Sequence, residues 1–176
     1  KQDTAAQCSD KAFVAAKMIA ASLAAGGKLM LCGNGGSAGD AQHLAAEFVA
    51  TLDHRHPRDG LPAMALTTDT SFITAYANDF GFEGVFARQV ATLGRPGDVL
   101  VCISTSGNSK NVLAAAQAAA KKDIVVIAMT GISYFQSMSF LHGFKFVWPS
   151  AIGGFLDFFQ SISGSFQLSL SMECML

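Results

Sequence analysis

Residues 28–47, KLMLCGNGGSAGDAQHLAAE, constrain the fold more than any other stretch of this chain. The apolar run 29–32 predicts a short buried strand, and residues 33–37, rich in glycine, predict a turn. A helix is expected from Ser37 to about Ala50. In α/β proteins, a strand, a glycine turn and a helix in this order present backbone N–H groups to an anion. The stretch therefore predicts an anion-binding loop.

Two residues of the expected helix, His43 and Glu47, are candidates for chemistry on the bound molecule. Their spacing of four residues puts both side chains on one helix face. We expect this face to lie about one helical turn beyond the glycine loop, where a carboxylate and an imidazole can act on the group attached to the anion. A surface His–Glu hydrogen bond is the alternative, but the preceding glycine loop favours the functional interpretation.

A second loop has the composition of an anion site. Residues 98–103, DVLVCI, predict a strand covered on both faces, and residues 111–120 predict an Ala-rich helix. Between them lies the segment Ser104-Thr105-Ser106-Gly107-Asn108-Ser109. Hydroxyl and backbone N–H groups both donate hydrogen bonds to anions. Serine and threonine are also common helix caps, so the evidence comes from the pairing of this loop with the first one.

Strands and helices alternate through residues 27–131, which predicts parallel βαβ units with helices on both faces of the sheet. Further strands are expected at 63–66 and 124–129 and, in a fifth position, at 145–148. Asp69 is expected to start a short helix carrying residues 73–77, and residues 78–82 to form a turn with a carboxylate at its tip. The helix at about 4–25 either packs against another subunit or is an ordinary covering helix.

Composition narrows the functional classes. The 176 residues suit one domain, and a net charge of −1 gives no electrostatic reason to expect nucleic acid. No uninterrupted apolar stretch is long enough to predict a membrane span. His54 and His56 lie in a loop rich in Pro and Gly and are expected to face solvent. Cys32 and Cys102 are expected to be small core residues in a reducing cytoplasm.

The segment CGNGGSAGDAQHLAAEF resembles the SIS (sugar isomerase) domain and, within it, the phosphoheptose isomerases. The likeness continues through residues 77–81, 103–109 and 129–131, and so covers about the first three quarters of the chain. Three matches in the right order are more specific than one glycine loop. The resemblance implies a three-layer αβα sandwich around a five-stranded parallel sheet, similar to flavodoxin and Rossmann folds. It also assigns the N-terminal helix, residues 1–26, to oligomerisation.

The resemblance further implies a reaction and a site. Family members convert sedoheptulose 7-phosphate to D-glycero-D-manno-heptose 7-phosphate through an enediol, on the route to ADP-heptose and lipopolysaccharide, and are cytoplasmic homotetramers. Glu47 matches the catalytic carboxylate, and His43 and Glu47 match two zinc ligands. Glu47 is also one of the implied substrate-binding residues, and the others are Asn34, Gly35, Gly36, Ser37, Asn78, Asp79, Ser104, Thr105, Ser106 and Ser109.

Residues 132–176 depart from the family pattern. The family's closing helix carries an IQExH-like motif whose Gln and His complete the zinc site, and this motif is absent here. Gln160 has no His after it, and His142 does not match, so no site residue is predicted beyond Gly131. The resemblance therefore implies an incomplete zinc site. A non-catalytic SIS-domain protein that binds a sugar phosphate or a replication initiator is the alternative; Glu47 favours the enzyme, because initiator-binding relatives lack this carboxylate.

Overall fold

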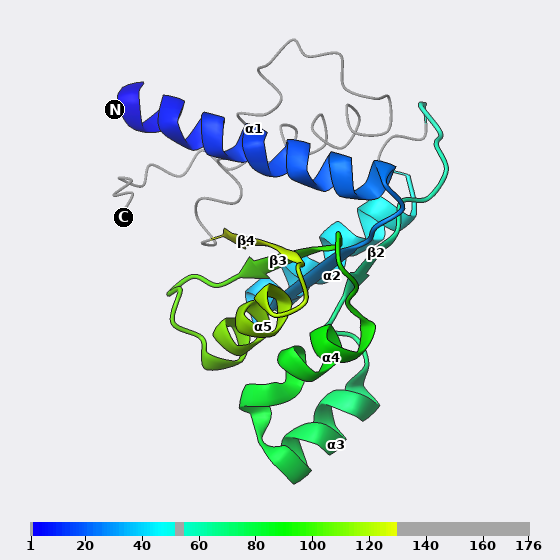
Figure 1. Ribbon diagram of the computed structural model, residues 1–176, viewed down its shortest axis with the longest axis vertical. Coiled ribbons are helices and arrows are strands. Elements are labelled where there is room, and N and C mark those ends of the chain that lie inside the picture. Colours follow the sequence, from blue (N-terminus) through cyan, green and yellow to red (C-terminus); the bar gives the residue numbers. More distant parts are fainter. Residues whose placement is uncertain (1, 52–54, 130–176) are drawn as a thin grey trace.

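A computed structural model describes residues 2–51 and 55–129 of the chain, with side chains from Ala12 onward (Figure 1). Helices and strands alternate along these residues, as the sequence predicts. The elements are α1 (Gln2–Ala24), β1 (Leu29–Gly33), α2 (Gly36–Val49), β2 (Ala63–Ala65), α3 (Thr70–Phe80), the short 3₁₀ helix η1 (Phe82–Gly84), α4 (Val85–Leu93), β3 (Val99–Ile103), α5 (Lys110–Ala120) and β4 (Val125–Met129).

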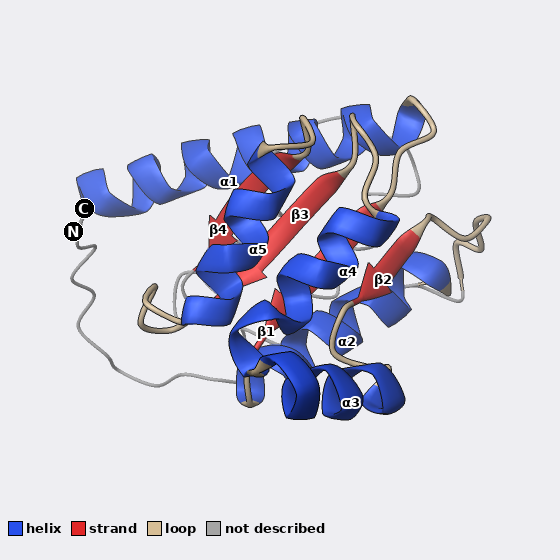
Figure 2. Ribbon diagram, turned by 60° about the horizontal axis from the view of Figure 1, so that its bottom comes forward, coloured by secondary structure: helices blue, strands red, loops and turns tan. Residues whose placement is uncertain are grey.

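The described strands form one parallel sheet in the order β2-β1-β3-β4. The two central strands pair residue by residue from Leu29 opposite Val99 to Gly33 opposite Ile103. Every residue of β1 and β3 is buried, as expected for strands covered on both faces. Figure 2 shows α1 and α2 on one face of the sheet and α4 and α5 on the other. The predicted three-layer αβα fold is therefore confirmed, whereas the fifth strand, at 145–148, lies outside the described residues.

The core has two halves, one on each face of the sheet. Leu29 and Leu31 pack with α2 residues such as Leu44, whereas Met30 and Leu100 pack with α4 and α5. This division follows from the strand geometry, since successive side chains point to opposite faces.

The predicted core cysteines are buried in the second half of the core. The Sγ atoms of Cys32 and Cys102 lie 3.9 Å apart, and the Cys32 thiol donates to that of Cys102. This hydrogen bond and burial both raise the pKa of Cys32, so its thiol stays protonated. The two residues behave as small apolar side chains, as the sequence predicts.

An ion pair lies at the edge of the sheet where β1 and β3 begin. Asp98, with only 2% of its surface exposed, accepts from Lys28 Nζ at 2.5 Å and from the backbone N–H groups of Lys28 at 3.0 Å and Arg95 at 2.8 Å. Three donors thus satisfy a carboxylate that burial alone would destabilise. The sequence identifies Asp98 only as the start of a strand.

Helix α3 is longer than predicted. Asn78 and Asp79 belong to its last turn, and the turn expected at 78–82 begins only at Gly81. The helix begins where predicted, since Asp69 Oδ1 accepts from Phe72 N at 2.9 Å. The ring of Tyr76 then contacts the rings of Phe72 and Phe80, with centroids 5.5 and 5.0 Å away respectively. These contacts between side chains four residues apart extend the helix. The expectation of a separate turn carrying Asp79 was therefore wrong.

None of the helices described is long and apolar enough to cross a membrane. Helix α1 covers part of the sheet through residues such as Phe13 and Ile19. Val14 and Met18, one turn apart on the same helix, are 54% and 44% exposed. Helix α1 therefore has an apolar surface that the described residues of this chain do not cover.

Candidate functional site

The two loops predicted to bind an anion lie at the same edge of the sheet. The first follows β1 and the second follows β3, and these strands are neighbours whose last residues, Gly33 and Ile103, pair with each other. Because both strands run in the same direction, both loops leave from the carboxyl edge, where ligands bind in open α/β sheets. The prediction that the loops share one edge is confirmed.

The first loop is a tight turn into α2. Gly35 precedes the helix with φ 55° and ψ −121°, a backbone conformation that side chains with a Cβ rarely adopt. Ser37 N donates to Asn34 O at 3.1 Å and Ala38 N to Gly35 O at 3.0 Å, which closes the turn. Gly35 and Gly36 are exposed, so their backbone is accessible to a ligand.

Gly33 allows this turn to pack closely against β3. A Cβ atom at Gly33 would lie 2.8 Å from Ser37 O and 2.9 Å from Ile103 O. We therefore expect Gly33→Ala to lower the free energy of unfolding by about 1–3 kcal/mol, because the backbone must shift to accept the methyl group. Thermal or urea unfolding measures this change.

Gly39→Ala is the matched control for that substitution. Gly39 lies inside α2, and a Cβ there meets nothing within 4 Å. Its stability should be unchanged or raised by up to about 1 kcal/mol, because alanine favours a helix. Equal unfolding curves for Gly33→Ala and the unmodified chain would contradict the steric argument.

The second loop, residues 104–109, is held together by hydrogen bonds between its own hydroxyl and backbone N–H groups. The Oγ atoms of Ser104 and Ser109 are 3.1 Å apart, and Gly107 N donates to Ser104 Oγ at 3.2 Å. Asn108 N donates to Ser106 Oγ at 3.2 Å. Ser104 is buried, whereas Thr105 and Ser106 are exposed. The loop is thus ordered by its own side chains and still presents hydroxyl groups outward.

A pair of side-chain amides joins the two loops. Asn34 Nδ2 donates to Asn111 Oδ1 at 2.9 Å, and Asn111 Nδ2 donates to Asn34 Oδ1 at 2.8 Å. Asn111, on the first turn of α5, is 4% exposed. Sequence reasoning missed Asn111, because its partner is 77 residues away. The only local signal was a polar residue at the start of an otherwise Ala-rich helix.

His43 and Glu47 form the predicted pair on α2, with His43 Nε2 3.7 Å from Glu47 Oε1. Their distance from the loops differs from the prediction. Glu47 is eleven residues beyond Gly36, so it lies roughly 16 Å along the helix axis, and His43 lies roughly 10 Å along it. The expectation of one helical turn was wrong, since α2 runs back along the sheet from its carboxyl edge.

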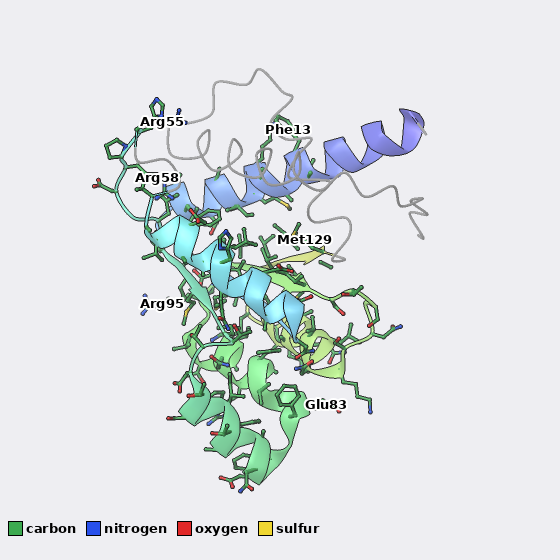
Figure 3. All side chains as sticks on the ribbon, turned by 180° about the vertical axis from the view of Figure 1, so that it is seen from behind. Phe13, Arg55, Arg58, Glu83, Arg95 and Met129 are labelled. Carbon is green, nitrogen blue, oxygen red and sulfur yellow. The ribbon has the colours of Figure 1, made fainter. Side chains whose placement is uncertain are left out.

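Charged neighbours surround this pair. Arg58 donates to the carbonyl groups of Glu47 at 2.7 Å and Phe48 at 2.9 Å, and so caps the C-terminal end of α2 (Figure 3). Burial lowers the pKa of Arg58, and the Glu47 charge partly offsets this. On the other side, burial raises the pKa of Asp40, and His43 opposes that shift. Sequence reasoning placed Asp40 on the first turn of this helix but did not identify Arg58 as part of the region.

Asn78 and Asp79, the candidates for the sugar hydroxyls, lie at the C-terminal end of α3. Asn78 Nδ2 donates to Asp79 Oδ1 at 2.8 Å on the exposed end of α3. His56 is exposed, as predicted, and His54 lies outside the described residues.

The metal site predicted by resemblance has two donors in the part of the chain that the structure describes. Within those residues no group of three or more His, Cys, Asp or Glu side chains is placed to hold a metal ion. His43 and Glu47 supply an imidazole and a carboxylate on one helix face, whereas structural and catalytic zinc sites use at least three protein ligands. The described residues therefore fit part of a zinc site.

Comparison with known proteins agrees with this arrangement. The model of the SIS domain matches residues 2–131. The chain belongs to the SIS domain family. The match includes both loops and α2, so the SIS domain accounts for nearly all of the described structure.

The relatives of this SIS domain include proteins named phosphoheptose isomerase. The one from Rhodospirillum rubrum is 58% identical over 125 residues, which is 70% of this chain and 65% of that protein. The one from Desulfovibrio desulfuricans is 63% identical over 113 residues, covering 64% and 53%. A solved phosphoheptose isomerase from Neisseria gonorrhoeae matches with a TM-score of 0.66 and 49% identity over 73% of this chain and 66% of that chain. The chain thus spans less than two thirds of the length of these curated relatives.

Proposed function

We propose that this chain is a phosphosugar isomerase that converts sedoheptulose 7-phosphate to D-glycero-D-manno-heptose 7-phosphate. The observation that carries the proposal is the pair of donor-rich loops at one sheet edge, joined by Asn34 and Asn111. Relatives named phosphoheptose isomerase, at 58% and 63% identity, support this substrate class. No observation on the described residues favours the non-catalytic alternative.

The phosphate group is assigned mainly to the second loop. Its donors are the hydroxyl groups of Ser104, Thr105, Ser106 and Ser109, with the start of α5 behind them. A dianion at a helix N-terminus is stabilised by the helix dipole and by backbone N–H groups. In the first loop, Gly35, Gly36 and Ser37 contribute backbone at the start of α2, and Asn78 and Asp79 are assigned to the sugar hydroxyls.

Glu47 is assigned as the base. Conversion of this ketose to the aldose moves one proton from C1 to C2 through an enediol, while a second proton passes from O1 to O2. The carbon-bound proton requires one group that takes it from C1 and returns it to C2. A carboxylate that is 19% exposed and close to both His43 and Arg58 can take this proton, which makes it neutral in the enediol intermediate, and can then return the proton to the second carbon. The phosphate and the reacting carbons are at opposite ends of this seven-carbon substrate, which is consistent with a base far along α2 from the phosphate loops.

Zinc remains part of the proposal as a group held by His43 and Glu47 together with ligands from outside the described residues. When bound, it would polarise the substrate oxygens as a Lewis acid. Since two donors do not make a complete site, the proton transfer assigned to Glu47 is derived without it. A cytoplasmic location and a homotetramer also remain predictions; the exposed Val14 and Met18 of α1 support association.

A direct assay tests the function. Purified full chain with sedoheptulose 7-phosphate should form the heptose phosphate, and its turnover should rise on addition of zinc and fall with a chelator, because a Lewis acid stabilises charge on the enediol oxygens. Calorimetry with the same substrate measures binding separately. Substrate binding with no product at any zinc concentration would reject the isomerase and favour the non-catalytic sugar phosphate binder.

A further inference from the structure

The hydrogen bonds of Asn111 define its orientation. Its Oδ1 accepts from Val112 N at 3.0 Å, so this atom must be the amide oxygen, and Asn34 must then donate to it. The Nδ2 group of Asn111 in turn donates to Asn34 Oδ1 at 2.8 Å. With 4% of its surface exposed, Asn111 has little contact with solvent. Its side chain is thus used to hold Asn34 and is not presented to a ligand.

The Asn34–Asn111 pair lies where the sheet no longer fixes the two loops. The β1–β3 ladder ends at Gly33 and Ile103, and Ser104 N is bonded to Met129 O of β4 at 2.9 Å rather than to the first loop. Beyond this point, the two reciprocal amide hydrogen bonds link the first loop to α5. Buried amides that satisfy each other define a single arrangement, because breaking the pair leaves polar groups unsatisfied.

We propose that Asn111 is a positioning residue that sets the separation of the two anion-binding loops by acting through Asn34. On this view, Asn34 serves the ligand through its backbone, and its side chain is a structural link. Removal of Asn111 lets the first loop move away from the second, so the donors no longer converge on one phosphate group. The substrate part of this inference rests on the proposed function, whereas the loop geometry does not.

Binding of inorganic phosphate to the full chain, measured by calorimetry, tests the proposal in Asn111→Ala, in Asn34→Ala and in the double variant. Each single variant should bind phosphate about 10-fold more weakly, and the double variant should be no more than about 3-fold worse than either, because residues acting as one unit are not additive. Gln117→Ala removes an exposed amide from the same helix and should bind like the unmodified chain.

Kinetics separate positioning from a general loss of structure. Asn111→Ala should raise KM about 10-fold and change kcat less than 3-fold, because it weakens binding of a phosphate group remote from the reacting carbons. Where Asn111→Ala fails to fold, Asn34→Ala tests the same link from its partly exposed side.

Three results would overturn the proposal: unchanged phosphate affinity in Asn111→Ala, unchanged phosphate affinity in Asn34→Ala, or full additivity in the double variant. Phosphate binding that depends on Asn111, in a chain without isomerase activity, would reject the proposed function and leave the positioning role intact.

Discussion

Replacement of Glu47 by glutamine is expected to lower isomerase turnover by about 10²–10⁴-fold, because the amide cannot accept the proton that moves between the two carbons. The change preserves shape, so α2 and the Arg58 bonds to its carbonyl groups should remain. Binding of inorganic phosphate should be unchanged, since Glu47 lies roughly 16 Å along α2 from the first loop. Steady-state kinetics and phosphate calorimetry on the same preparation measure the two effects.

Glu83→Gln is the matched control. It removes the same charge from an exposed position on η1, away from α2 (Figure 3), and should leave kcat and KM within about 2-fold. If Glu47→Gln retained the turnover of this control, Glu47 would not be the base, and the reaction would need another proton acceptor. Loss of phosphate binding in Glu47→Gln would instead indicate a structural effect that reaches the loops.

Replacement of Asp98 by alanine is expected to cost about 3 kcal/mol of folding free energy, because it leaves Lys28 and two backbone N–H groups without their acceptor at a buried position. For a chain of this size, that corresponds to a fall in Tm of roughly 6–12 °C. Differential scanning calorimetry measures this. Asp59→Ala removes an exposed loop carboxylate and should change stability by less than about 0.5 kcal/mol.

The Asp98 contribution should also depend on pH. Burial opposes ionisation of Asp98, but the hydrogen bonds from Lys28 and Arg95 and the Lys28 charge outweigh it, so the pKa of Asp98 is lowered. A lowered pKa stabilises the folded chain above the unfolded value of about 3.9, and this stability is lost as pH falls through the folded value. The stability difference between the unmodified chain and Asp98→Asn should therefore shrink below about pH 4. A constant difference down to acid denaturation would contradict this.

The local sequence pattern was sufficient to predict the described strands of the sheet and the edge at which the two loops lie. The apolar runs that became β1 and β3 have no polar residue to place on a solvent face, so only burial on both sides suits them. Once both strands are parallel, their following loops must leave from one edge. The glycines and serines after these strands then predicted an anion site at that edge.

Pairings between distant residues could not be predicted in this way. Asn111 and Asp98 have partners 77 and 70 positions away, and nothing in the flanking residues indicates them. The end of α3 was misjudged because Asn78 and Asp79 favour turns, whereas the ring contacts that extend the helix follow a spacing of four residues. The distance of Glu47 from the loops needed only the helical rise, which the sequence already allowed us to count.

The alignment of Gly33 with Ile103 has a consequence for redesign. The backbone hydrogen bonds between neighbouring strands hold them about 4.8 Å apart, so the two loops are the same distance apart where they begin. The space between the loops cannot be widened for a bulkier anion by separating β1 from β3, because the backbone hydrogen bonds between these strands would be lost. Engineering toward other acidic ligands must therefore lengthen or reshape the loops and leave the central pair of strands untouched.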